Sequence, residues 1–339
     1  MTDSLVPEAT ATEHPFAQYV RILGKGKTGS RSLDREEARD AFGMLLCGEA
    51  EPVQVGAFLM LLRVKEESPQ EIAGFVEACR ANMLLPSPEL QADLDWSSYA
   101  GKRHQHPWFI LSMLLLAQAG YRVFVHGSAG HTPGRLYTEQ AMRALGLPVA
   151  DNWSAVEHNL DSTGISYLPL KHICPVLDDI LQLKPLLGLR SPVNTLTRML
   201  NPLAARASIQ SIFHPAYAAI HQQADRLLGQ QRALVFKGES GEIEVKPQAD
   251  TRIFLLEQSS QRELLAQRAL AERVAPVREP DTNPLLALWR GDVIDPYGLQ
   301  AAIATTAAAL VLLRPNTSFE EQRSEAEALW RARDTGRLG

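Results

Sequence analysis

The chain has 339 residues, of which 45% are hydrophobic and 22% are charged, a composition typical of a globular protein with one large or two medium domains. Its formal net charge is −5 and its pI is near 6.0, which excludes a polycation that binds nucleic acid through its overall charge. Any binding of anions therefore depends on a local cluster of Lys and Arg side chains.

The N-terminal sequence MTDSLVPEATATEHP contains neither a basic nor an apolar segment, so we expect no secretory signal. The three cysteines, Cys47, Cys79 and Cys174, are far apart and have no metal-binding spacing, which predicts reduced thiols. The longest apolar run, WFILSMLLLA (108–117), is about half a membrane span and predicts a buried helix. We therefore expect a cytoplasmic protein with no membrane contact.

Residues 16–92 contain helix patterns only. LDREEARDAFGMLLCG (33–48) has acidic residues in its first turn and ends at a glycine, and EPVQVGAFLMLLRVKEES (51–68) has a proline near its start. SPQEIAGFVEACRANML (68–84) begins with the capping-box residues Ser68 and Glu71, with Pro69 at the first helical position. These patterns predict a small helical domain over residues 14–92.

From residue 93 onward, helix and strand patterns alternate. A helix is predicted over 106–120, a strand over YRVFVHG (121–127) and a helix over 135–147, followed by GISYLPL (164–170). Further along come a helix over 214–229, a strand over RALVFKG (232–238), a turn followed by EIEVKP (242–247), and a small-residue core helix over 299–313. The alternation predicts an α/β domain with a mostly parallel sheet, built from 93–170 and 191–339, while helices around 172–190 join the helical domain.

A glycine-rich turn, VHGSAGHTPGR (125–135), connects a predicted strand to a predicted helix. Such a turn can present backbone N–H groups to a phosphate. Its spacing matches neither the P-loop nor the dinucleotide-binding motif, so an ordinary connection is an equal alternative. His126 and His131 have no nearby carboxylate pair, which favours hydrogen-bonded histidines over metal ligands.

Two basic segments flank this turn. Residues 180–224 contain Lys184, Arg190, Arg198 and Arg206 and no acidic residue, which indicates an anion-binding surface, although any one of them can be an ordinary solvated charge. The preceding loop, YAGKRHQHPW (99–108), has two adjacent cations after a single glycine.

Several segments together resemble one enzyme family. GMLLCGEAEPVQVGAFLMLLRVKEESPQEIAGFVEACR (43–80) resembles the helical domain of anthranilate phosphoribosyltransferases. KHICPVL (171–177), LGLRSPVNTLTRMLNPL (187–203) and FHPAYAAIHQQADRLLGQQRALVFKGESGEIE (213–244) resemble later segments of that family, in the same order. The resemblance implies the two-domain fold shared with pyrimidine nucleoside phosphorylases, and a homodimer formed through the helical domain.

The chain departs from this family where the family binds phosphate and metal. The GTGGD loop that wraps the pyrophosphate of phosphoribosyl pyrophosphate reads YAGKRHQ (99–105), and the KHGNR turn keeps only its His and Gly. The magnesium-binding Asp-Glu pair reads Ile243 and Glu244. The resemblance therefore implies a remnant phosphate site, with no catalytic residue and no metal site, made of Gly101, His126, Gly127, Gly134, Arg135 and Asn194.

In losing acidic metal ligands and gaining basic residues, the chain resembles the divergent TrpD2/YbiB-like branch of the family. This resemblance implies a non-enzymatic, dimeric nucleic-acid-binding protein without a cofactor. The first hypothesis is therefore that single-stranded DNA or RNA lies in a basic groove formed by Lys102, Arg103, Lys171, Lys184, Arg190, Arg198 and Arg206. About four phosphate contacts per subunit would give a dimer a log–log salt slope of roughly −5 to −6. Few aromatic residues lie nearby, so sequence readout would be weak.

The second hypothesis is a phosphoribosyl or glycosyl transferase with an altered acceptor. Its surviving site would contain His126, Gly127, Gly134, Arg190, Asn194 and Glu244, and it would require magnesium. A paralogue that only binds other proteins is a third alternative, which no sequence feature favours.

Overall fold

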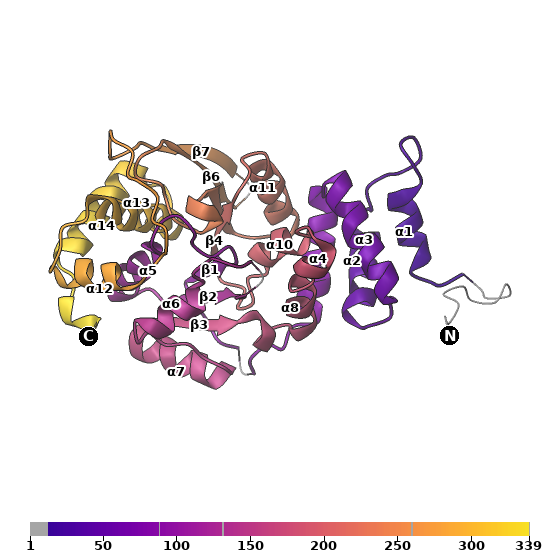
Figure 1. Cartoon of the computed structure of the whole chain (residues 1–339), viewed down its shortest axis with the longest axis horizontal. Helices are drawn as coiled ribbons and strands as arrows, with labels where there is room; N and C mark the ends of the chain where they lie inside the picture. Colours follow the sequence, from indigo (N-terminus) through magenta and orange to yellow (C-terminus); the bar gives the residue numbers. More distant parts are fainter. Residues whose placement is uncertain (1–12, 88, 131, 259, 339) are drawn as a thin grey trace.

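The computed structural model describes residues 13–87, 89–130, 132–258 and 260–338. The molecule is elongated, with the helical domain at one end and the α/β domain at the other (Figure 1). The helical domain consists of α1 (Ala17–Gly24), α2 (Arg35–Leu46), α3 (Pro52–Lys65) and α4 (Pro69–Ala81). Three later helices lie at the junction of the domains: α8 (Pro175–Leu181), α9 (Lys184–Leu187) and α10 (Val193–Leu196).

Local sequence signals explain where these helices begin. The Ser68 hydroxyl accepts a hydrogen bond from the Glu71 N–H, the Glu71 side chain returns to the Ser68 backbone, and Pro69 occupies the first turn of α4. Asp34 and Glu37 form the same capping box at α2. The helical pattern predicted for this region is confirmed.

The α/β domain is built on a seven-stranded sheet with the order β3-β2-β1-β4-β5-β6-β7. β1 to β5 are parallel, and β6 and β7 are antiparallel additions at one edge, so the prediction of a mostly parallel sheet is confirmed. The strands are β1 (Leu94–Ser98), β2 (Val123–Gly127), β3 (Ile165–Pro169), β4 (Ala207–Ile212), β5 (Arg232–Lys237), β6 (Thr251–Glu257) and β7 (Ser260–Ala266).

Four strands, β1, β4, β6 and β7, have no counterpart among the sequence predictions. β1 and β4 read LDWSS and ASIQSI and are fully buried, although half of their residues are polar. Buried polar residues remove the apolar run that marks a parallel strand. Residues 242–247, which follow β5, form no strand.

Helices cover both faces of the sheet. They are α5 (Phe109–Gln118), α6 (Thr138–Ala144), α7 (Trp153–Thr163), α11 (Tyr217–Leu227), α12 (Asn283–Arg290), α13 (Pro296–Leu313) and α14 (Phe319–Arg331), with short 3-10 helices η1 (Leu170–His172), η2 (Thr197–Met199), η3 (Glu239–Gly241) and η4 (Thr335–Arg337). Along β2, Val123 and Val125 face the core under α5, α13 and α14, whereas Phe124 faces the core shared with the helical domain. α13 is long and apolar enough to cross a membrane, but 78% of it is buried and it packs on α14 and α5.

The topology places one crevice at the carboxyl edge of the sheet. From β1 the chain moves to β2 and β3 in one direction, and from β4 to β5 in the other. The loops that follow β1 and β4 therefore diverge at the carboxyl ends of two neighbouring parallel strands. Ligands of open α/β sheets bind at such switch points, so the loops after β1, β4 and β5 surround the candidate ligand site.

Candidate anion-binding site

The loop after β1 contacts a carboxylate of the protein itself. Glu242 Oε1 accepts hydrogen bonds from the backbone N–H groups of Ala100 (2.7 Å) and Gly101 (2.5 Å). Its second oxygen, Oε2, accepts a hydrogen bond from Ser98 Oγ at 2.7 Å. Glu242 is 1% exposed, and Gly101 has a φ of +69°, a conformation that favours glycine. The N–H groups of the predicted remnant phosphate loop are thus already paired.

The structure corrects the prediction that Lys102 contacts nucleic acid. The side chain is fully buried, and its Nζ lies 2.5 Å from Glu244 Oε1. The other Glu244 oxygen accepts the Phe109 N–H at 3.0 Å. Backbone hydrogen bonds in both directions between Lys102 and Leu136 hold this part of the loop against the turn before α6. An ammonium in this position cannot reach a phosphate in solvent.

The guanidinium groups of Arg198 and Arg135 donate hydrogen bonds to backbone carbonyl oxygens of the same loops. Arg198, only 7% exposed, donates Nη1–H to the Ser211 and Gly241 carbonyl oxygens at 2.6 and 2.9 Å. Arg135 donates to the carbonyl oxygens of residues 100, 101 and 240 at 2.8–3.1 Å. Burial lowers the pKa of Arg198 to about 10, so it stays charged at neutral pH. Arg198 thus supports these loops and also lines the pocket described below, and its contact with nucleic acid stays a prediction.

Two other predicted residues have structural roles. His126 is fully buried, with Nδ1 2.6 Å from the Tyr99 hydroxyl and Nε2 3.1 Å from Asp95 Oδ1. Gly127 lies where a Cβ atom would be 2.0 Å from the Ser98 carbonyl oxygen, so close packing requires glycine there. Gly134 has a φ of +71° and faces open space. His131 lies outside the described residues.

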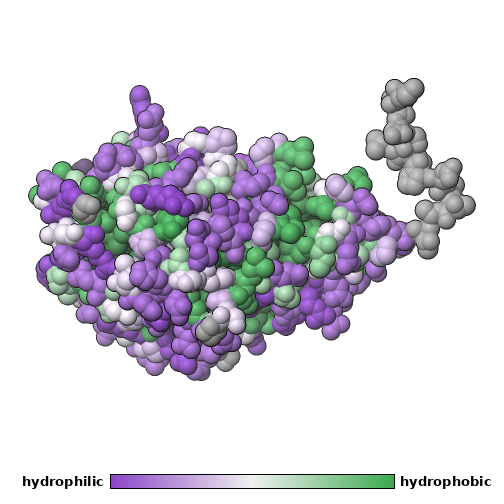
Figure 2. Space-filling model, turned by 90° about the horizontal axis from the view of Figure 1, so that it is seen from below, coloured by the Kyte–Doolittle hydropathy of each residue, from purple (hydrophilic) through white to green (hydrophobic). Residues whose placement is uncertain are grey.

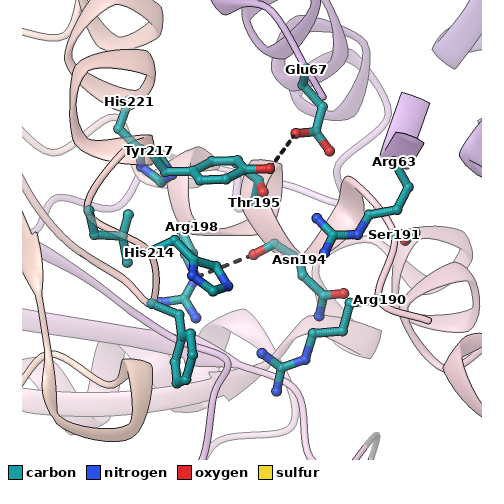
Figure 3. Close-up of a pocket in the computed structure, with 12 residues that line it drawn as sticks. Arg63, Glu67, Arg190, Ser191, Asn194, Thr195, Arg198, His214, Tyr217 and His221 are labelled. Atoms are coloured by element: carbon teal, nitrogen blue, oxygen red, sulfur yellow. Dashed lines mark hydrogen bonds between the residues drawn. The ribbon is translucent and has the colours of Figure 1, made fainter. Parts of the chain in front are cut away.

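A pocket opens beside these loops, between the two domains (Figure 3). It measures about 610 Å³ including its open mouth, within the range of small-molecule sites. Arg63, Arg190 and Asn194 lie on one side, and His214 and Tyr217 on the other. The full lining is Arg63 and Glu67 from the helical domain, Arg190, Ser191, Asn194, Thr195 and Arg198 around α10, and Ile212, Phe213, His214, Tyr217 and His221 after β4.

The pocket has an excess of positive charge. No hydrogen bond or ion pair joins the guanidinium of Arg63 or Arg190 to another described residue. Burial, followed by repulsion from Arg63, lowers the pKa of Arg190. Glu67 is the acidic side chain of the lining; it accepts the Tyr217 hydroxyl at 3.3 Å, and burial raises its pKa. The pocket thus contains two guanidinium groups without a hydrogen-bonding partner among the described residues, beside one carboxyl that is hydrogen-bonded to Tyr217.

The other predicted cations do not form one continuous groove. Partial burial and repulsion from Arg190 and Arg135 lower the pKa of Lys184, so these three lie near one another. Arg103, in the loop after β1, and Lys171, in η1 after β3, are exposed at the same carboxyl edge of the sheet. Arg206, in contrast, precedes β4 and lines a separate cleft with Arg80 and Gln230 at the amino end of the strand. Six strand residues separate it from the pocket, roughly 20 Å.

A divalent cation does not fit the residues present. Among the described residues, no group of three His, Cys, Asp or Glu side chains is positioned to hold a metal ion. Ile243 supplies no ligand atom, and both oxygens of Glu244 are paired, one with the Lys102 ammonium. Glu244 already has its counter-charge within the protein, in the ammonium of Lys102.

Sequence reasoning missed Glu242, Arg63 and the aromatic wall of the pocket. Glu242 stands in a short acidic run, GESGEIE, whose charges would ordinarily be exposed. Arg63 lies on α3, far in sequence from both basic segments. For Glu242, the one available signal in the sequence was the acidic run itself, because it contains two glycines and directly follows a buried strand.

Comparisons with known proteins agree with this architecture. Residues 18–83 match a family model described as the helical bundle domain of a glycosyl transferase family, and residues 110–272 match the a/b domain of the same family. The fold and its domain-junction pocket thus define a two-domain protein of the glycosyl transferase class. Anthranilate phosphoribosyltransferase of Methylorubrum extorquens strain PA1 is 30% identical over 71% of this chain and 70% of that protein. The chain belongs to the anthranilate phosphoribosyltransferase family.

A protein of Escherichia coli K12 named uncharacterized protein YbiB is 28% identical over 79% of this chain and 85% of its own length. The fold is also that of anthranilate phosphoribosyltransferase from Thermus thermophilus, with a TM-score of 0.75 and 21% identity over 93% of this chain and 94% of that one. The Saccharomyces cerevisiae enzyme, solved in complex with PRPP and Mg, has a TM-score of 0.74 and 17% identity over 94% and 93%. At these identities the two structures establish the fold alone.

Proposed function

We propose that this protein binds phosphate-bearing ligands in the pocket between its domains, and that single-stranded DNA or RNA is the ligand class. The observation that carries the proposal is the pair of unpaired guanidinium groups, Arg63 and Arg190, at the mouth of a crevice where the sheet topology places ligands. Arginine binds phosphate through two parallel N–H donors. In Arg63 and Arg190, no described residue accepts a hydrogen bond from these donors.

The wall opposite the arginines suits a flat ring. Phe213 is 48% exposed although it is a large aromatic residue, and His214 stacks edge-to-face against it with ring centroids 5.0 Å apart. Exposed aromatic side chains beside a basic groove are where unpaired bases stack, largely without sequence preference. Lys184, Arg135 and Arg103 extend the positive charge from the pocket along the carboxyl edge.

The test is a fluorescence-anisotropy titration of a single-stranded oligonucleotide at increasing salt. We expect binding at low salt without magnesium, with log K falling linearly as log salt rises, by about 0.7 per phosphate contact. Arg190→Ala should weaken binding and make that slope shallower by about 0.7 per site. Arg226→Ala, which removes an exposed arginine of α11, is the matched control and should bind as the wild type does. Binding that Arg190→Ala leaves unchanged, or its absence at 50 mM salt, overturns the proposal.

Pentosyl transfer with an altered substrate is the second candidate, and family membership favours it. The M. extorquens relative carries the name anthranilate phosphoribosyltransferase and aligns over most of this chain. Against it stand the loop N–H groups paired with Glu242 and the Glu244 carboxylate paired with Lys102. Phosphoribosyl pyrophosphate with magnesium is therefore the second arm of the titration. Magnesium-dependent binding with pyrophosphate release upon addition of an acceptor would favour the transferase.

We also propose a homodimer formed through the helical domain. Val53 and Val64 on α3 and Leu186 on α9 are each about four-fifths exposed (79%, 82% and 82%), which is unusual for large apolar side chains in adjacent helices. Figure 2 shows hydrophobic residues gathered over this end of the molecule. Light scattering should give twice the chain mass of 37.4 kDa, and Val64→Asp should shift the mass toward one chain. A wild-type mass of one chain contradicts the dimer.

We also propose that the protein is located in the cytoplasm. Cys47, Cys79 and Cys174 are all free thiols in the structure, which is what a reducing compartment maintains.

A further inference from the structure

The loop between β1 and α5 has the chemistry of an oxyanion receptor. Three donors, the N–H groups of Ala100 and Gly101 and the hydroxyl of Ser98, point at one carboxylate from a different loop. Consecutive backbone N–H groups that converge on one oxygen bind anions, and hydrogen bonds to a charged acceptor are the strong class. The receptor is fully formed in the native fold, because every donor belongs to a buried residue.

The surrounding charges also suit an anion. Arg135 donates to the Ala100 and Gly101 carbonyl oxygens, and Arg198 donates to the Gly241 carbonyl oxygen next to Glu242. Burial lowers the pKa of both arginines, and attraction to Glu242 opposes this lowering, so their charges lie close to its carboxylate. Two guanidinium groups and three hydrogen-bond donors therefore surround a single negative charge that the chain supplies itself.

We infer that residues 98–101 form a working oxyanion site, which Glu242 fills and thereby closes to small external oxyanions of the phosphate and carboxylate class. The site is separate from the arginine pocket in its donors, so the inference stands independently of what that pocket binds. Removing the Glu242 side chain leaves an empty, positively biased cavity with three donors in the shape of a carboxylate. Acetate and inorganic phosphate are the external anions that match it.

The experiment compares Glu242→Ala with wild-type protein, in thermal-shift and calorimetric titrations with sodium acetate, sodium phosphate and, at matched ionic strength, sodium chloride. The variant should melt at a lower temperature in chloride and regain stability with acetate or phosphate. Its affinity for these anions should exceed that of the wild type by about tenfold or more, the effect of one charge-assisted hydrogen bond. Chloride should not substitute.

Two further variants separate this effect from general destabilisation. Glu239→Ala removes a neighbouring buried carboxyl that pairs with Lys246 and Ser240 instead of the loop, so acetate should not rescue it. Glu242→Gln keeps the cavity filled and should not respond to acetate either. If Glu242→Ala does not fold in chloride, it should fold when acetate or phosphate is present during refolding. Failure to fold with either anion, or a folded variant that ignores both, overturns the inference.

Discussion

Lys102→Ala is expected to lower the free energy of unfolding by about 3–5 kcal/mol at pH 8, the effect of leaving one member of a buried ion pair without its partner. The remaining carboxylate, Glu244, is fully buried and would keep only the Phe109 N–H as a donor. Urea denaturation followed by circular dichroism measures the change.

The loss should depend on pH in a defined direction. Burial raises the pKa of Glu244 from 4.5 to about 7, and the Lys102 ammonium opposes that rise. Without Lys102 the native carboxyl holds its proton to a still higher pH, whereas the unfolded chain releases it near 4.5. A raised acid pKa stabilises the native state at low pH, and this contribution disappears as pH rises through the folded pKa. Wild type and variant should therefore both lose up to about 1.4 kcal/mol per pH unit between pH 5 and 7, and only the variant should go on losing stability above about pH 7, so it is less impaired relative to wild type at pH 5 than at pH 8.

Neighbouring substitutions provide the controls. Arg103→Ala changes an exposed residue next to Lys102 and should alter stability by about 0.5 kcal/mol or less. The uncharged pair Lys102→Met with Glu244→Gln should recover part of the loss, because no lone charge stays buried. Equal effects of Lys102→Ala and Arg103→Ala would show that the buried pair is not the cause.

Gly127→Ala is expected to destabilise the protein by about 3 kcal/mol or more, through overpacking at the end of β2. The new Cβ would lie 2.0 Å from the Ser98 carbonyl oxygen and 2.8 Å from the Tyr167 hydroxyl. Because residues 98 and 127 are register partners of paired strands, neither backbone can move without disrupting the β1–β2 pairing. The denaturation midpoint in guanidinium chloride measures the loss.

Gly43→Ala is the matched control. Gly43 lies inside α2 with no atom within 4 Å of its added Cβ, so the same change should stabilise by about 0.5–1 kcal/mol. A role of Gly127 in binding a ligand makes a different prediction, namely normal stability with impaired binding. A wild-type midpoint for Gly127→Ala would support that role and contradict the steric explanation.

The helical domain and the class of sheet follow from local signals. Ser68, Pro69 and Glu71 specify a helix start within four residues. The apolar residues at 121–127 predict a strand without knowledge of the neighbouring strands. β1 escaped prediction because Asp95, Ser97 and Ser98 are buried with their partners 29 to 144 residues away. The spacing of these polar residues along the sequence does not show that they are buried in the sheet.

Lys102 and Arg103 illustrate the division most directly. As adjacent cations in one loop they are equivalent by any sequence measure, and the sequence determined only that basic residues stand where the family has a phosphate loop. The tertiary structure buried the first against Glu244, 142 residues away, and left the second in solvent. Helix starts, strand periods and family membership are local and cumulative properties of a sequence. Which charges pair in the interior was decided only by folding, because the order of the strands determines which loops meet at the edge of the sheet.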